Sequence, residues 1–247
     1  MPSPLAALTS SIGHLLDRAR DAFGSPRAGG VAVAMVLLVT VGTALGVVAL
    51  GAVFDATVDQ RITVDNPDRP SESTCETFGD DSDSILADRC EEPERVEVDA
   101  GEELRDAASG YIHYGLLGVP IWWVVFALAL HVGARVAGGS GSVGDSFVIA
   151  GWAIGVELLR LAVGLAAIWY ALSNAAIAGS TFEALTSDIV AAITSTTGPL
   201  LVASAVGIAV QWVVVVGGLE AEHDLDRGAA AGVATVFAAL ALLLAAV

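Results

Sequence analysis

The sequence contains no lysine: its 11 basic residues are all arginine, against 28 aspartate and glutamate residues, and the formal net charge at pH 7 is -17. A nucleic-acid-binding protein needs clustered basic side chains to neutralise phosphates, and no such stripe occurs, so nucleic acid is excluded as a partner. Dense carboxylates without lysine are typical of adaptation to high salt, where cations screen the repulsion. We infer an extreme halophile as the source.

Cysteine is also scarce, since Cys75 and Cys90 are the only two in the chain. They lack the spacing and the additional ligands that a metal or redox centre needs, so we predict no metal site. Both lie in a polar segment that is assigned below to the outer face of the membrane, where oxidised cysteine persists. The sequence therefore predicts a structural disulfide between them.

Catalytic motifs are missing as well. The chain has no Gly-x-Ser-x-Gly, no His-Glu-x-x-His and no phosphate-binding Gly-Lys-Ser/Thr loop. The glycines between 138 and 144 follow no strand and include no lysine, so they do not indicate phosphate binding. We predict that the protein is not an enzyme and uses no cofactor.

Long apolar runs dominate the rest of the chain, of which 55% is hydrophobic and 16% charged. About 20 consecutive apolar residues suffice to cross a bilayer as a helix. We therefore predict an all-α integral membrane protein with about five transmembrane helices, amphipathic interfacial helices and an acidic extracellular loop. The predicted membrane domain covers residues 30–247, with spans at about 31–54, 112–136, 147–172, 200–219 and 229–247.

Residues 1–29 precede the first span, and their apolar side chains recur at helical spacing, as Ile12, Leu16 and Phe23 illustrate. This predicts an amphipathic helix on the cytoplasmic side. It either lies in the membrane interface or packs on other cytoplasmic elements. A second short amphipathic helix, near 181–193, is predicted to lie along the outer interface.

Arginine placement sets the predicted orientation in the cell membrane. The short segments that carry arginine precede the first span, join the second to the third and precede the last, so they share one side, which we assign to the cytoplasm. The N-terminus is then cytoplasmic, and the C-terminus and loop 55–110 are extracellular. The loop has 18 acidic and five basic residues, and this composition predicts little core of its own.

Glu157 and Arg160 fall near the middle of the third span, where charges are costly. Three residues apart, they share a helix face and can pair. One interpretation is a structural ion pair that holds this helix against Gln211 or Ser204 of the next span. The other is a gate or ion pathway.

A polar turn joins the second and third spans. His131 and Arg135 end the helix before it, where we expect them to face the helix dipole and lipid headgroups rather than to relay protons. A second cytoplasmic segment, 220–227, carries several carboxylates and His223, which we interpret as a solvated charge run rather than a metal site.

The turn resembles that of the Yip family of five-span membrane proteins. The resemblance rests on His131, Arg135, Gly138, Gly139 and Gly141, followed by Ser146-Phe147, and on Gly218-Leu219 with His223 before the last span. It implies a membrane scaffold in vesicle traffic or membrane organisation, without catalysis or a cofactor. The signatures of eukaryotic members that bind Rab-type GTPases are absent, so that activity is not implied.

Two functions follow from these observations. The first is a non-catalytic membrane-organising or protein-interaction scaffold, whose partners are the lipid bilayer and other membrane proteins or further copies of itself. The alternative is a small-solute or ion permease that uses Glu157 and Arg160. No internal repeat of the kind many transporters contain is visible in the sequence.

Overall fold

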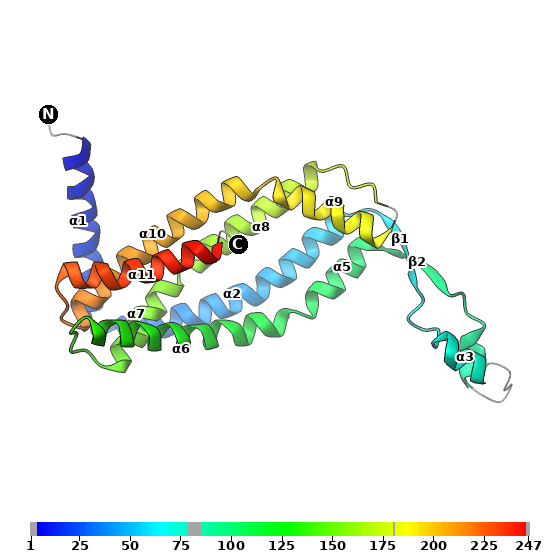
Figure 1. Ribbon diagram of the computed structural model, residues 1–247, viewed down its shortest axis with the longest axis horizontal. Coiled ribbons are helices and arrows are strands. Elements are labelled where there is room, and N and C mark those ends of the chain that lie inside the picture. The colour runs from blue at the N-terminus through cyan, green and yellow to red at the C-terminus, as the bar shows by residue number, and fades with distance from the viewer. Residues whose placement is uncertain (1–3, 79–84, 180, 246–247) are drawn as a thin grey trace.

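The computed structural model describes residues 4–78, 85–179 and 181–245, and most of these are helical (Figure 1). Four helical segments in this part are long and apolar enough to cross a membrane, which confirms the all-α membrane fold. They are α2 (Ala28–Thr57), α5 (Ala100–Ser109) continued by α6 (Ile112–Val136), α7 (Val143–Ile154) continued by α8 (Glu157–Asn174), and α10 (Thr197–Glu222). The predicted fifth span corresponds to α11 (Arg227–Ala245), which is apolar but shorter.

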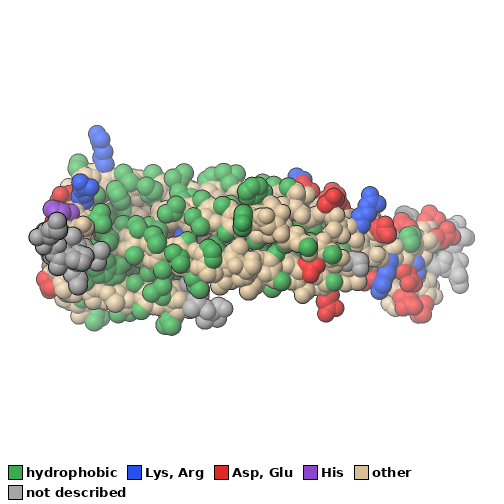
Figure 2. All heavy atoms as spheres, turned by 90° about the horizontal axis from the view of Figure 1, so that it is seen from above, with side chains coloured by type: hydrophobic (Ala, Val, Ile, Leu, Met, Phe, Trp, Pro, Cys, Tyr) green, Lys and Arg blue, Asp and Glu red, His purple; other side chains and the backbone are tan. Residues whose placement is uncertain are grey.

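The outside of this bundle is apolar over most of its length. Figure 2 shows hydrophobic side chains along the middle of the molecule, with most acidic and basic side chains at one end and a smaller number at the other. Large exposed side chains of this belt include Leu37, Leu45, Leu117, Ile121 and Val202. In water such a surface would be strongly unfavourable, whereas lipid chains solvate it, so the bundle is a membrane domain.

The third apolar segment is divided, although the sequence predicts one continuous helix over 147–172. The break falls at Gly155 and Val156, where the amide of Gly155 donates to the carbonyl of Trp152, three residues back. Glycine and a β-branched residue are weak helix formers. Gly155 also packs on Met35 of α2, where a Cβ would lie 3.3 Å from the sulfur.

Helix α1 (Pro4–Phe23) lies across the bundle rather than along it (Figure 1). Leu16 and Phe23 are buried against α10, and Gly217 lets the two backbones approach, since a Cβ there would lie 2.7 Å from the Cβ of Ala19. Ile12 and Leu15 remain exposed. Helix α1 thus packs on another element and still presents apolar side chains outward. We call the end of the molecule that holds α1, the turn 137–142 between α6 and α7, and the segment 223–226 between α10 and α11 the hairpin end.

The opposite end, the arm end, carries the only sheet in the described residues. Strands β1 (Arg61–Asp65) and β2 (Arg95–Asp99) pair antiparallel, with Ile62 opposite Val98. Two short helices, α3 (Glu72–Phe78) and α4 (Ile85–Cys90), lie beyond the strands and point away from the bundle (Figure 1). The sequence analysis did not predict the strands, although both alternate polar and apolar residues, because each is only five residues long and lies in a segment dominated by acidic residues.

A small core fixes the arm to the bundle. Val58, Ile62 and Ala100 are buried against Leu172 and residues of α9 (Phe182–Thr194). As expected from its composition, the acidic segment relies on apolar side chains from later parts of the chain. The amphipathic helix predicted near 181–193 corresponds to α9.

Candidate functional site

The turn after α6 ends that helix with a glycine in the left-handed conformation. Gly138 has φ +91°, its amide donates to the carbonyl of Arg135, and the amide of Gly139 donates to the carbonyl of Ala134. This pair of hydrogen bonds is the Schellman motif, and it satisfies carbonyls that the helix end would leave unpaired. The Arg135 guanidinium also donates to the carbonyl of Gly139 at 3.2 Å.

The other two turn glycines are needed for close approach. A Cβ on Gly139 would lie 3.2 Å from the Cβ of His223, and one on Gly141 would lie 2.6 Å from Nδ1 of His223 and collide with the carbonyl oxygen of Glu222. Between them, the amide of Ser140 donates to the carbonyl of His223 at 3.0 Å. The turn therefore lies directly on the segment that links α10 to α11.

Ser146, near the start of α7, contacts two histidines from different helices. Its hydroxyl lies 2.9 Å from Nε2 of His223 and 3.4 Å from Nδ1 of His131. Ser146 and His223 are fully buried. We call His131, Ser146 and His223 the histidine cluster; it joins α6, α7 and the end of α10. Among the described residues no group of three His, Cys, Asp or Glu side chains could hold a metal ion.

Burial lowers the pKa of His223, which lies just beyond the last residue of α10. Desolvation is the largest cause, and electrostatic interactions with His131 and Arg135 act in the same direction, while Asp145 and Asp224 oppose them. Within the described residues Nδ1 of His223 has no hydrogen-bond partner. The site thus favours neutral imidazole, with one nitrogen bonded to Ser146.

The segment 220–227 is not the solvated charge run that its composition suggests. Glu220 is only 8% exposed and His223 is completely buried, so this prediction was wrong for both residues. Arg227 donates through Nε to Glu220 at 2.8 Å and through Nη2 to Asp17 of α1 at 2.8 Å. The ion pairs join the consecutive helices α10 and α11 to α1, which lies some 200 residues earlier in the chain. No local pattern could reveal the contact with α1.

Glu157 and Arg160 lie together at the start of α8. Arg160 donates through Nη1 to Glu157 at 2.8 Å and through Nη2 to the carbonyl of Ser204 in α10 at 3.2 Å. Gly207 accommodates the arginine, because a Cβ there would lie 2.8 Å from Nε. The pair therefore bridges two helices, and Ser204 takes part through its backbone.

The same two residues line a cavity of about 900 Å³ between α2, α6, α8, α10 and α11. Most of its walls are valine, alanine, phenylalanine and tryptophan side chains. Its polar lining comes chiefly from Tyr111, Tyr114, Glu157, Arg160 and Gln211.

Comparison with known protein families identifies the family of this chain. The family described as Yip1 domain matches residues 91–247, which is more than half of the chain. The chain belongs to the Yip1 family. No curated protein and no solved structure matches it. Together with its apolar helices, this membership makes the chain a multi-pass membrane protein.

The Yip1 match includes the turn, the histidine cluster, the Glu157–Arg160 pair and α11, and it confirms the resemblance read from the turn. Helices α1 and α2 lie outside the matched residues although both pack on matched ones. Of the predicted site residues, the structure brings His131 close to Ser146 and His223, and Gly139 and Gly141 onto Glu222 and His223. Arg135 bonds within the turn, to the carbonyl of Gly139. The sequence analysis did not predict that His223 is buried. The one indication was that His223 belongs to the residues that carry the family resemblance.

Cys75 and Cys90 form a disulfide, as predicted. The bond joins α3 to α4 at the far end of the arm. It lies at the opposite end of the molecule from the histidine cluster (Figure 1), so it stabilises the arm and takes no part in that site.

Proposed function

We propose that this Yip1-family protein is a non-catalytic scaffold that organises other membrane proteins, or copies of itself, in the cell membrane. Its hairpin end faces the cytoplasm and is the interaction surface, while the arm faces outward. The arginine bias of the short segments supports this orientation, since Arg18, Arg20, Arg27, Arg135 and Arg227 all belong to the hairpin end.

The proposal rests on one observation, which is that the residues carrying the family resemblance serve packing between segments of the chain. Gly139 and Gly141 allow close backbone packing, and Ser146 and His223 are buried and hydrogen-bonded to each other. Their packing joins the turn after α6 and the start of α7 to the segment between α10 and α11. Such a use suits a binding surface of fixed shape better than a catalytic centre.

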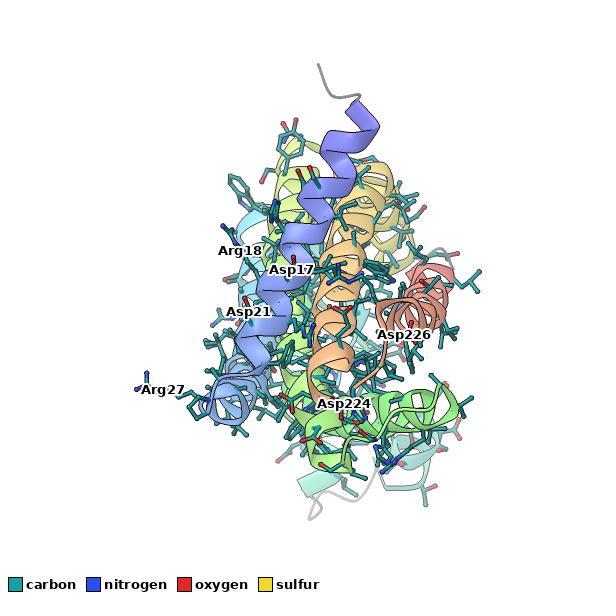
Figure 3. All side chains as sticks on the ribbon, turned by 90° about the vertical axis from the view of Figure 1, so that its left-hand side faces the viewer. Asp17, Arg18, Asp21, Arg27, Asp224 and Asp226 are labelled. Atoms are coloured by element: carbon teal, nitrogen blue, oxygen red, sulfur yellow. A yellow bond between two sulfur atoms is a disulfide. The ribbon has the colours of Figure 1, made fainter. Side chains whose placement is uncertain are left out.

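Charged side chains cover this surface. Figure 3 views the hairpin end face-on, with Asp17, Arg18 and Asp21 along α1 and Arg27 pointing away from the bundle. Asp224 lies at the end of α10, and Asp226 lies on the side of α10 away from α1. These residues are exposed. Mixed charges at a rim give specificity and steer encounter with a partner.

In-membrane cross-linking at native salt, followed by purification of the tagged protein, tests the proposal. The variant Arg18→Gln/Arg27→Gln removes two exposed charges at the hairpin end. The matched control, Arg61→Gln/Arg95→Gln, makes the same change on the strands of the arm. We expect a reproducible set of membrane proteins with the wild type and the control, and its loss with the hairpin-end variant.

Equal recovery with both variants would count against the hairpin end as the interaction surface. A protein that gives neither partner nor self cross-links would count against a scaffold altogether. Thermal unfolding of each variant shows whether any loss reflects misfolding rather than recognition.

A small-solute or ion permease is the second candidate, and the break before Glu157 favours it. Transporters often place their sites where a helix is interrupted near the membrane centre. The test is flux into vesicles that contain the purified protein, with Glu157→Gln as the variant. A flux that Glu157→Gln abolishes, while the protein remains folded, would favour the permease over the scaffold.

A further inference from the structure

The cavity beside Glu157 and Arg160 has a shape suited to a membrane lipid. We propose that it is a binding site for one glycerolipid of the surrounding bilayer, whose apolar chains enter sideways between α6 and α11. This inference does not depend on the scaffold function, because a lipid can occupy the cavity whatever the hairpin end binds.

The cavity is open toward the bilayer because α11 leaves α6 partway along the bundle. Near the hairpin end the two helices touch, with the rings of Phe126 and Phe237 5.6 Å apart and Gly133 packed against Val233. Farther from that end their ribbons diverge (Figure 1). Trp122, Leu240 and other lining side chains are about half exposed, so the outer wall of the cavity is incomplete.

The depth of the cavity places it within the hydrocarbon layer. Glu157 lies roughly 20 Å along the helices from the first residue of α7, at about 1.5 Å per residue. The hydrocarbon core is about 30 Å thick. On α6 the lining continues to Tyr111 and Tyr114, beyond the level of Glu157 and toward the arm end. Tyrosines at such a position suit the zone of lipid headgroups.

The volume favours a lipid over a helix of another protein. A spanning helix of about 20 residues, some 10 Å wide and 30 Å long, occupies more than about 2,000 Å³. The cavity holds about 900 Å³, which falls within the range of about 300–1,000 Å³ for sites that bind molecules of ligand size. A helix could cover the opening but could not enter.

A glycerolipid would also account for the polar side chains that line the cavity, which a purely apolar ligand would leave without a role. Glu157, Arg160 and Gln211 line the cavity on its α8 and α10 side, and the ion pair has no net charge. A neutral pair and an amide offer hydrogen bonds to the ester or ether linkages of a glycerolipid. The phosphate-bearing headgroup lies toward Tyr111 and Tyr114.

Photolabelling in vesicles tests the site directly. The purified full-length protein is reconstituted with phosphatidylglycerol that carries a diazirine in one acyl chain, illuminated and mapped by mass spectrometry. We expect labelling concentrated on cavity residues such as Val125 and Leu240, above that of lipid-facing residues such as Leu37 on α2. Labelling spread evenly over all lipid-facing residues would overturn the proposal.

A filled cavity supplies the second test. A Cβ at Gly118 would meet no atom within 4 Å and the residue lines the cavity, so we expect Gly118→Trp to occupy it. Gly232→Trp is the matched control, on an equally open position of α11 that does not line the cavity. Lipid retained by the washed, detergent-solubilised protein is then extracted and quantified.

We expect the wild type and Gly232→Trp to retain stoichiometric glycerolipid and Gly118→Trp to lose it. Equal retention by all three proteins, or none by the wild type, would contradict a specific site. A cross-link from a second copy of the chain to cavity residues would show that protein fills the opening instead. If Gly118→Trp does not fold, the labelling pattern of the wild type decides alone.

Discussion

The guanidinium of Arg227 donates through Nε to the buried carboxylate of Glu220 at 2.8 Å. The Glu220 side chain is 6% exposed, whereas Asp17, the other partner of Arg227, is 61% exposed. A buried carboxylate depends strongly on its partner, because water cannot replace the lost contact. An exposed carboxylate depends little on its partner, because water solvates it.

Arg227→Gln should therefore lower the melting temperature by several degrees, and Asp17→Asn should lower it much less. The double variant Arg227→Gln/Glu220→Gln should recover a large part of the loss, because it leaves no unpaired buried charge. Thermal unfolding in detergent at constant high salt measures all three. Equal effects of Arg227→Gln and Asp17→Asn would show that Glu220 is solvated.

Gly141→Ala should destabilise the fold by about 1–3 kcal/mol, because its Cβ would collide with the carbonyl of Glu222 and Nδ1 of His223. Gly144→Ala is the control, since a Cβ there meets only the Ser142 hydroxyl, at 3.4 Å. Because Gly144 lies in the first turn of α7, Gly144→Ala should leave the free energy of unfolding unchanged or increase it slightly. Chemical unfolding of both variants gives the comparison, and similar values for the two would contradict close packing of the turn.

His223 should titrate below its ordinary pKa of about 6.5, because burial disfavours the imidazolium. The neutral form then stabilises the fold above about pH 6.5, and this contribution is lost as the pH falls toward the folded-state pKa. Nuclear magnetic resonance of ring-labelled histidine follows the titration, and His223→Gln assigns the signal. In that variant stability should depend less on pH over the same window. A pKa above 6.5 would contradict the buried, neutral state.

The proposed orientation predicts which engineered cysteines a membrane-impermeant maleimide can reach. Glu103→Cys, exposed on α5, should react in intact cells, and Ser25→Cys, exposed after α1, should react only after lysis. The native cysteines do not interfere, since both are in the disulfide. The reverse pattern would invert the orientation and place the hairpin end outside the cell.

The disulfide should matter for the arm alone. Cys75→Ser/Cys90→Ser should remove roughly 3 kcal/mol of chain-entropy stabilisation from the arm, making it sensitive to protease. The melting temperature of the bundle should not change, because α3 and α4 lie beyond the strands and away from the long helices (Figure 1). A lowered melting temperature would show that the arm and the bundle unfold together.

The sequence by itself determined the fold class, the approximate limits of the long helices, the disulfide and the family. These depend on local composition, spacing and turn residues: apolar runs long enough for a bilayer, two cysteines in one loop, and a helix-ending glycine at 138. Helix α11 (Arg227–Ala245) overlaps the predicted span 229–247 because the apolar run after Gly228 is a local signal.

Only the tertiary structure decided how separate segments combine. The burial of Glu220 and His223, the bridge from Arg227 to Asp17 and the cavity between α6 and α11 all depend on residues distant in the chain. A carboxylate or histidine in a short polar segment looks solvated when only its neighbours are known. Whether it is buried depends on the packing of other helices over it, which local sequence does not encode.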